Sequence, residues 1–178
     1  GVGACLKHFA VNNQELGRMY MDAVVDDRTL REIYLRGFEI AIRTAKPWTV
    51  MCAYNRLNGV YCSEHDWLLN TVLREEWGFE GSVMTDWGAA NDRPLGVKAG
   101  LDLEMPGSGG VNDALVVQAV ANGDLDEADL DRAIARNIAL SLSSLNRQKP
   151  ATPADPAEQH RLARKAAAPP RRPPPNAT

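Results

Sequence analysis

The chain has 178 residues, a net charge of −3, 44% hydrophobic residues and 24% charged residues. These values are typical of a globular chain, and the length suits one domain or part of a larger one. The near-neutral charge argues against a dedicated nucleic-acid-binding protein, and no apolar run reaches the roughly 18 residues that a membrane span needs. We therefore expect neither a nucleic-acid partner nor a membrane partner.

The cysteines and histidines exclude further classes. The three cysteines are too few and too scattered for a disulfide framework, and none of them forms a Cys-x-x-Cys pair. The three histidines, His8, His65 and His160, show no paired ligand spacing. We expect no metal and no cofactor.

Apolar runs alternate with amphipathic segments along the first 145 residues. Residues 4–9 form a short apolar run that predicts a buried strand, and residues 28–44 repeat apolar side chains at helical spacing. Asp26 or Asp27 is a suitable N-cap for that helix, and Pro47 follows its end. The dipeptide Asn58-Gly59 predicts a turn. Further strands are expected at residues 49–54, 81–86 and 101–105, and further helices at 66–77, 89–99, 111–121 and 126–145.

This alternation of strands and helices is typical of βα units that build a parallel sheet. Four strands are about half of what a closed (β/α)8 barrel needs. The sequence therefore predicts an α/β fold, the C-terminal half of a TIM-like barrel. A small doubly wound sheet is the alternative.

The two ends of the chain differ from the body. The chain begins at Gly1 without a Met or a signal-like apolar core, which suggests processing or a start within a longer protein. From residue 147 onward it is rich in Pro and Arg, and Pro interrupts helices. We expect residues 1–145 to form a partial barrel domain. Residues 146–178 are expected to hold a linker, the start of a lost second domain and a disordered Pro/Arg-rich tail.

Polar and aromatic side chains stand at the ends of three predicted strands. Each has an ordinary explanation when taken alone, such as a helix cap or a hydrogen-bonded core histidine. Because the carboxyl ends of parallel strands share one edge of a sheet, the combination indicates a ligand site there. The residues concerned are Lys7, His8, Tyr54, Asn55, Asp86 and Trp87.

Several linked motifs resemble family 3 glycoside hydrolases of the β-glucosidase type. The resemblance covers about residues 1–145, with the motifs in family order and at family-like spacing. Its specificity comes from the combination, since any one motif alone is weak. The motifs are KHFAVNNQE at 7–15 with Arg18, REIYLRGFE at 31–39, VMCAYN at 50–55, LREEWGFEG at 73–81, VMTDW at 83–87 and GLDLEMP at 100–106.

The resemblance implies a retaining, exo-acting enzyme that removes β-glucosyl units from non-reducing ends of glucosides or oligosaccharides. It implies a first domain with a (β/α) barrel and a following α/β sandwich domain that supplies the general acid/base. By the same resemblance Asp86 is the nucleophile. The residues implied to bind substrate are Lys7, His8, Arg18, Met51, Tyr54 and Trp87.

The chemistry of these residue types agrees with the resemblance. A retaining glycosidase needs one ionised carboxylate beneath the anomeric carbon, and a cation such as Lys7 is suited to favour the ionised form of Asp86. The hydroxyl of Tyr54 can orient that carboxylate. Lys, His and Arg supply donors for sugar hydroxyls, and an aromatic face such as Trp87 suits the C–H surface of a pyranose.

Two details separate this chain from related specificities. The second His that follows Lys-His-Phe in β-N-acetylglucosaminidases of the same family type is absent, because Asn12 and Asn13 occupy that stretch. β-Xylosidase-like relatives more often carry Cys after the nucleophile, where this chain has Trp87. Both details favour a glucosidase.

Two other hypotheses remain open at this point. No carboxylate of the chain matches the acid/base motif of the family, so a non-catalytic sugar-binding or assembly fragment that needs a complementary chain is the main alternative. A doubly wound phosphate-binding module is weaker, because the loop at 107–110 lacks the Lys-Ser/Thr ending. Residues 157–167 resemble the helix that opens the second domain in the family.

Overall fold

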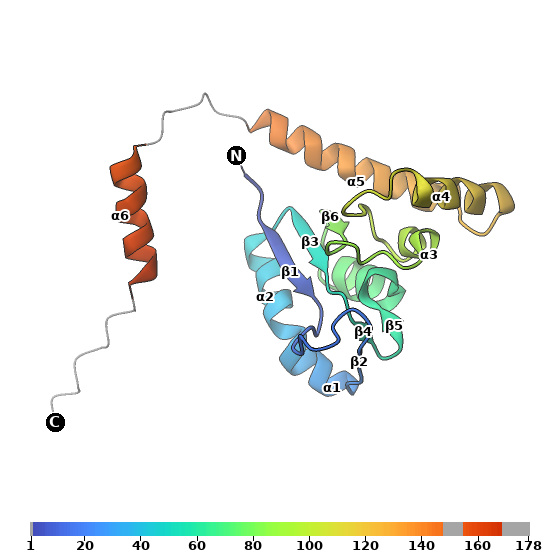
Figure 1. Ribbon diagram of the computed structural model, residues 1–178, viewed down its shortest axis with the longest axis horizontal. Coiled ribbons are helices and arrows are strands. Elements are labelled where there is room, and N and C mark those ends of the chain that lie inside the picture. Colours follow the sequence, from blue (N-terminus) through green and yellow to red (C-terminus); the bar gives the residue numbers. More distant parts are fainter. Residues whose placement is uncertain (1, 148–154, 169–178) are drawn as a thin grey trace. The chain divides into compact units, whose positions relative to one another are not determined.

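A computed structural model describes residues 2–147 and 155–168. The chain divides into two units, residues 1–148 and 149–178, which we describe separately. In the first unit, a parallel sheet of three strands has the order β1-β3-β6 (Figure 1). Its strands are β1 (Cys5–Phe9), β3 (Thr49–Cys52) and β6 (Ser82–Met84).

The parallel α/β arrangement expected from the sequence is confirmed in this sheet. Cys5 pairs with Thr49, and Thr49 pairs with Ser82, so the three strands start level with one another. The fourth expected strand is reduced to an isolated parallel bridge between Met84 and Leu103. All the strand ends that matter for the site therefore lie at one edge.

The first predicted helix is present but divided. It comprises α1 (Asp27–Thr29), a π-helical segment η1 (Leu30–Tyr34) and α2 (Arg36–Ala45). Asp26 is the N-cap, and its side chain accepts a hydrogen bond from the Thr29 amide at 3.0 Å, which satisfies one amide that the first helical turn leaves free.

The second predicted helix follows a short 3-10 turn. The turn is η2 (Cys62–Glu64), and the helix η3 (Trp67–Glu76) is π-helical. Its fully buried side chains pack with those of the sheet, including Phe9, Val50 and Val83, to form the main hydrophobic core. Each such side chain contributes about 1.5–3 kcal/mol through burial. The buried side chains of η3 are Leu68, Leu69, Val72 and Leu73.

Three further helices complete the first unit. They are α3 (Arg93–Lys98), α4 (Val111–Asn122) and α5 (Glu127–Asn146). The predicted helices at 111–121 and 126–145 are confirmed, whereas the helix expected at 89–99 is shorter. A second apolar cluster consists of Val97, Val116, Ala119 and Leu125, and Leu130 of α5 packs against it.

A small second sheet is absent from the sequence-based prediction. It contains β2 (Asp22–Ala23), β4 (Arg56–Leu57) and β5 (Val60–Tyr61). Asn58 and Gly59 both have positive φ in the turn between β4 and β5, as tight hairpin turns require. The turn was predictable from this dipeptide, but strands of two residues are too short to show a periodic pattern.

The described part of the second unit is one helix, α6 (Pro156–Ala167). Asp155 caps it by accepting a hydrogen bond from the Ala157 amide at 2.9 Å. The helix expected at 157–167 is thereby confirmed, while the predicted linker and the Pro/Arg-rich end at 148–154 and 169–178 lie outside the described residues. Within 2–147 and 155–168, no helix has the length and apolar character needed to cross a membrane.

Candidate active site

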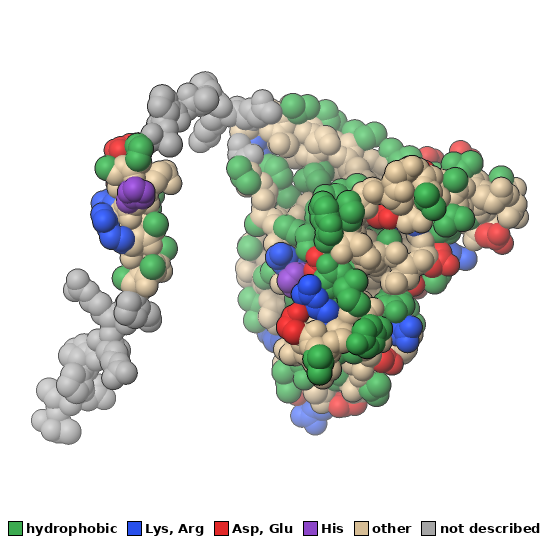
Figure 2. Space-filling view, viewed as in Figure 1, with side chains coloured by type: hydrophobic (Ala, Val, Ile, Leu, Met, Phe, Trp, Pro, Cys, Tyr) green, Lys and Arg blue, Asp and Glu red, His purple; other side chains and the backbone are tan. Residues whose placement is uncertain are grey.

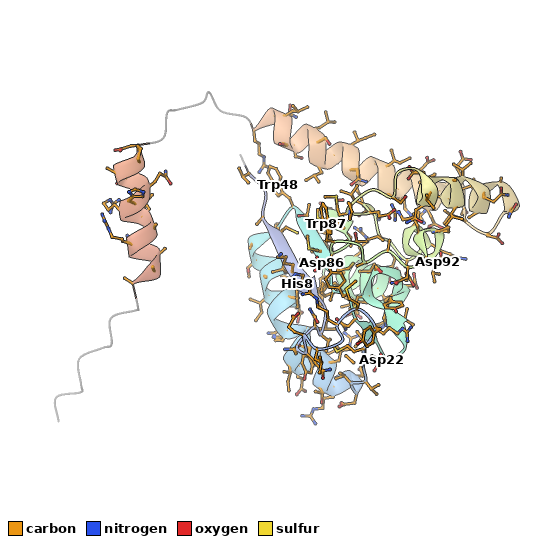
Figure 3. All side chains as sticks on the ribbon, in the orientation of Figure 1. His8, Asp22, Trp48, Asp86, Trp87 and Asp92 are labelled. Carbon is orange, nitrogen blue, oxygen red and sulfur yellow. The ribbon has the colours of Figure 1, made fainter. Side chains whose placement is uncertain are left out.

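The carboxyl edge of the sheet brings His8 and Asp86 into contact (Figure 3). His8 lies near the end of β1, and Asp86 follows β6 by two residues. The Nε2 atom of His8 lies 3.2 Å from Oδ2 of Asp86, and the two side chains are 33% and 15% exposed. A ring nitrogen that can carry a proton therefore faces a carboxylate that remains partly open to solvent.

The second carboxylate oxygen of Asp86 is held locally. Oδ1 accepts a hydrogen bond from the backbone amide of Trp87 at 2.7 Å. This contact fixes one oxygen next to the backbone and leaves Oδ2 toward His8. The carboxylate thus has a defined orientation with few permanent partners.

Tyr54, which follows β3, holds the segment after Asp86. Its phenol is largely buried and donates a hydrogen bond to the carbonyl of Trp87 at 2.8 Å. Burial raises the pKa of Tyr54, and the negative charge of Asp86 raises it further. The phenol therefore stays protonated at neutral pH, close to the carboxylate.

Arg18 joins the site through Tyr54. The guanidinium carbon lies 4.7 Å from the centre of the Tyr54 ring, within cation–π range. Its Nη1 atom donates to Glu15 at 2.9 Å, and Glu15 also accepts from Asn12 at 3.3 Å. The loop after β1 therefore presents Arg18 beside the Tyr54 ring.

The remaining residues predicted to bind substrate are Lys7, Met51 and Trp87. Lys7 is exposed, and among the ion pairs of the described residues the partner of Asp86 is His8. Met51 is half-buried on β3, in register with Met84. Trp87 is 64% exposed, and on this face charged side chains gather beside hydrophobic ones (Figure 2).

Among the ion pairs of the described residues, the partner of Asp86 is His8, and the role of Lys7 stays a prediction. The pairing of β1 with β3 shifts register between Leu6 and Phe9, so Lys7 and His8 do not follow the regular alternation of strand side chains. Asn55 also differs from its neighbours at the strand ends, because it is fully buried and donates to the carbonyls of Ala10 and Arg56. It supports the backbone and does not face the site.

Comparison with known proteins decides the family. Residues 1–140 match the glycosyl hydrolase family 3 N terminal domain. The chain belongs to glycosyl hydrolase family 3. This family 3 chain is 55% identical over 168 residues to thermostable beta-glucosidase B of Acetivibrio thermocellus. The alignment covers 94% of the chain and 22% of that protein. It is 54% identical over 132 residues to an exo-alpha-(1->6)-L-arabinopyranosidase of Bifidobacterium breve, covering 74% of the chain and 17% of the relative.

Solved structures agree with the family assignment. Beta-glucosidase 3B from Thermotoga neapolitana in complex with alpha-D-glucose has a TM-score of 0.87 and 44% identity, over 93% of this chain and 24% of that one. A family 3 beta-glucosidase of Bifidobacterium adolescentis gives the same values. The chain spans about a fifth of the length of the curated relatives described above.

In this family 3 chain, the segment after Asp86 is held by residues that the sequence analysis did not single out. Glu64 is buried, and its Oε1 atom accepts from the amides of Asn91 and Asp92 at 3.1 and 2.8 Å. Ser63 donates to the carbonyl of Ala89 at 2.8 Å. No local sequence pattern links these positions, because the contacts join segments about 27 residues apart.

Cavities lie at both ends of the strands. A hollow of 300 Å³ adjoins His8 and is also lined by Asn12, Tyr34 and Phe38. A larger one of 630 Å³ lies at the amino ends of the strands, beside Trp48, so size alone does not mark the site. In the described parts of the chain, no group of three or more His, Cys, Asp or Glu side chains is arranged to hold a metal ion.

Proposed function

We propose that this chain carries the nucleophile and part of the sugar-binding site of a retaining, exo-acting β-glucosidase. Such an enzyme hydrolyses O-glycosyl bonds and releases β-D-glucose from non-reducing ends. The contact between His8 and Asp86, 3.2 Å long at the carboxyl edge of the sheet, carries the proposal. The similarity to two beta-glucosidases, at 55% and 44% identity, supports it.

The proposed reaction has two displacements. An oxygen of Asp86 forms a bond to the anomeric carbon while the glycosidic C–O bond breaks, and a general acid protonates the departing oxygen. Water, deprotonated by the same group, then attacks the anomeric carbon and releases Asp86. In this proposal, the general acid/base belongs to an α/β sandwich domain that acts together with this chain. Its carboxyl group lies about 5–5.5 Å from that of the nucleophile.

The other site residues have binding roles in the proposal. Lys7, His8 and Arg18 donate hydrogen bonds to hydroxyls of the bound sugar. Tyr54 remains protonated, and its link to the Trp87 carbonyl supports the backbone around the nucleophile. Met51 lines the pocket, and the exposed ring of Trp87 forms an apolar wall for the sugar.

We further propose that the parallel sheet is the C-terminal half of a (β/α)8 barrel. The β1-β3-β6 order and the bridge between Met84 and Leu103 support a sheet that continues around the barrel in chain order. The partial barrel domain covers residues 1–145. In this proposal, α6 belongs to the beginning of the second domain.

A covalent-labelling experiment tests the role of Asp86. The purified chain is incubated with 2,4-dinitrophenyl 2-deoxy-2-fluoro-β-D-glucoside, whose good leaving group does not need the general acid. We expect one sugar on the peptide 83–87 of the wild type and none in Asp86→Asn. Asp92→Asn is the matched control, because Asn can replace the Asp92 side chain that caps α3.

The outcomes separate the hypotheses. A label on another carboxylate would refute Asp86 as the nucleophile. If no label appears although the chain is folded, a non-catalytic sugar-binding or assembly role for the chain gains support. The remaining segments are then added in trans, and the presence or absence of hydrolysis decides between this role and the proposed nucleophile. The corresponding α-L-arabinopyranosyl probe tests the specificity that the name of the Bifidobacterium breve relative suggests.

A further inference from the structure

Asp86 and Trp87 lie between two residues, Thr85 and Gly88, that both form hydrogen bonds with the backbone of Met105. On the amino side, Oγ1 of Thr85 accepts a hydrogen bond from the Met105 amide at 2.7 Å and donates to the Met105 carbonyl at 3.2 Å. On the other side, the amide of Gly88 donates to the same carbonyl at 2.7 Å. The nucleophile therefore sits in a short loop that is closed by Met105.

The Thr85 hydroxyl is well suited to close this loop. Thr85 is fully buried, and its amide donates to the Leu103 carbonyl at 3.0 Å. The hydroxyl both donates to and accepts from the backbone of Met105. These contacts follow the isolated bridge between Met84 and Leu103, after which β6 has ended. A side-chain contact thus takes over from the backbone ladder one residue before the nucleophile.

We propose that Thr85 is a positioning residue, and that its contacts with Met105 set the direction in which the Asp86 carboxylate faces the anomeric carbon. This inference rests on the proposed function of Asp86 as nucleophile. Bond formation requires the reacting atoms to be aligned about 3–3.5 Å apart, and a displacement of about 1 Å can cost a factor of about 100 in rate. A loop closed on both sides restricts such displacements.

The same loop reaches Tyr54. The Tyr54 phenol donates to the carbonyl of Trp87, inside the closed loop, and the charge of Asp86 contributes to its raised pKa. A shift of the loop therefore changes the surroundings of Tyr54 whether or not the chain turns over substrate. Tyr54 is an internal reporter of the position of Asp86.

Two variants of Thr85 and one matched control test the proposal. Thr85→Val keeps the shape of the side chain and removes both hydrogen bonds, while Thr85→Ser keeps the hydroxyl. Thr49→Val makes the same change at a buried threonine at the amino end of β3, away from the loop. Urea unfolding compares the stability lost in the two Val variants.

The first readout is the rate of labelling by the fluoroglucoside. For Thr85→Val we expect the rate at saturating probe to fall about 10- to 100-fold, because only alignment is lost. The concentration for half-maximal rate should stay unchanged, and Thr85→Ser and Thr49→Val should label like the wild type. Equal rate losses in the two Val variants would overturn the proposal.

The second readout does not depend on catalysis. With ¹³C-labelled tyrosine, the NMR titration of Tyr54 should shift in Thr85→Val toward an ordinary tyrosine and stay unchanged in Thr49→Val. If the wild type takes no label but this shift occurs, Thr85 still positions the loop that holds Asp86, and the reconstitution of hydrolysis in trans then decides the proposed function separately. An unchanged Tyr54 titration in Thr85→Val overturns the positioning role.

Discussion

Two aspartates of the first unit, Asp102 and Asp86, stand in opposite surroundings. The Asp102 side chain is fully buried, and its oxygens accept from Arg74 at 2.7 Å, from Arg136 at 3.0 Å and from the Val83 amide at 2.7 Å. Burial lowers the pKa of Arg74, and the charge of Asp102 opposes that change. Asp102 thus joins η3, α5 and β6 through permanent protein donors.

Asp86 has no arginine among its ion-pair partners in the described residues. Its carboxylate contacts His8 at 3.2 Å and the adjacent amide of Trp87, the Tyr54 phenol also interacts with it, and the side chain stays 15% exposed. Its oxygens keep lone pairs that protein donors do not occupy. The comparison shows the same residue type in two settings of one sheet: Asp102 is fully buried and paired with two arginines, whereas Asp86 is paired with His8 and partly exposed.

Removal of Asp102 should produce the largest change in stability. Asp102→Ala leaves the buried guanidinium of Arg74 without its carboxylate, and such a loss costs about 3–5 kcal/mol in the free energy of unfolding. Urea denaturation followed by circular dichroism measures the loss. A variant within 1 kcal/mol of the wild type, about the value of a surface pair, would remove the distinction between the two aspartates.

Tyr54→Phe should have an intermediate and pH-dependent effect. Loss of the hydrogen bond to the Trp87 carbonyl should cost about 0.5–1.5 kcal/mol at neutral pH. Because the folded state raises the pKa of Tyr54 above its ordinary value of 10.0, this residue contributes stability below pH 10.0 that is lost as pH rises through the raised pKa.

The difference between the wild type and Tyr54→Phe should therefore shrink in alkaline solution. Unfolding curves at neutral pH and at several values above pH 10.0 measure it. Tyr61→Phe is a suitable control, because Tyr61 contacts Arg56 in the small second sheet, outside the site. A difference that grows with pH would contradict the assigned surroundings of Tyr54.

Asp86→Asn should have the smallest effect on stability. Its contact with His8 is partly exposed, and pairs of this kind contribute about 0–1 kcal/mol. We expect an unfolding free energy close to that of the wild type, measured in urea, together with loss of fluoroglucoside labelling. A destabilisation as large as that of Asp102→Ala would show that Asp86 has a structural role as well.

Much of the fold was predictable because its signals are local. The apolar runs at 4–9, 49–54 and 81–86 became the parallel strands, and Asp26 caps the first helix as expected. The strand ends also indicated where a site would form. The strands β4 and β5 of the hairpin were not predicted, because each strand has only two residues.

Contacts between distant segments were not predictable from local patterns. The sequence pointed to Lys7 as the cation for Asp86, whereas the ion pair that the described residues form with Asp86 comes from His8. The roles of Thr85, Glu64 and Asp102 depend on backbone groups that come close only after the sheet has formed.

The sequence by itself therefore determined the order of the strands and helices, the helix caps and the set of residue types at the carboxyl edge, because periodicity and capping act over a few neighbouring residues. The tertiary structure alone decided which of two aspartates is fully buried between arginines and which stays partly exposed. The surroundings of each aspartate depend on which side chains and backbone amides come into contact across strands and helices, and the packing of the whole core determines those contacts.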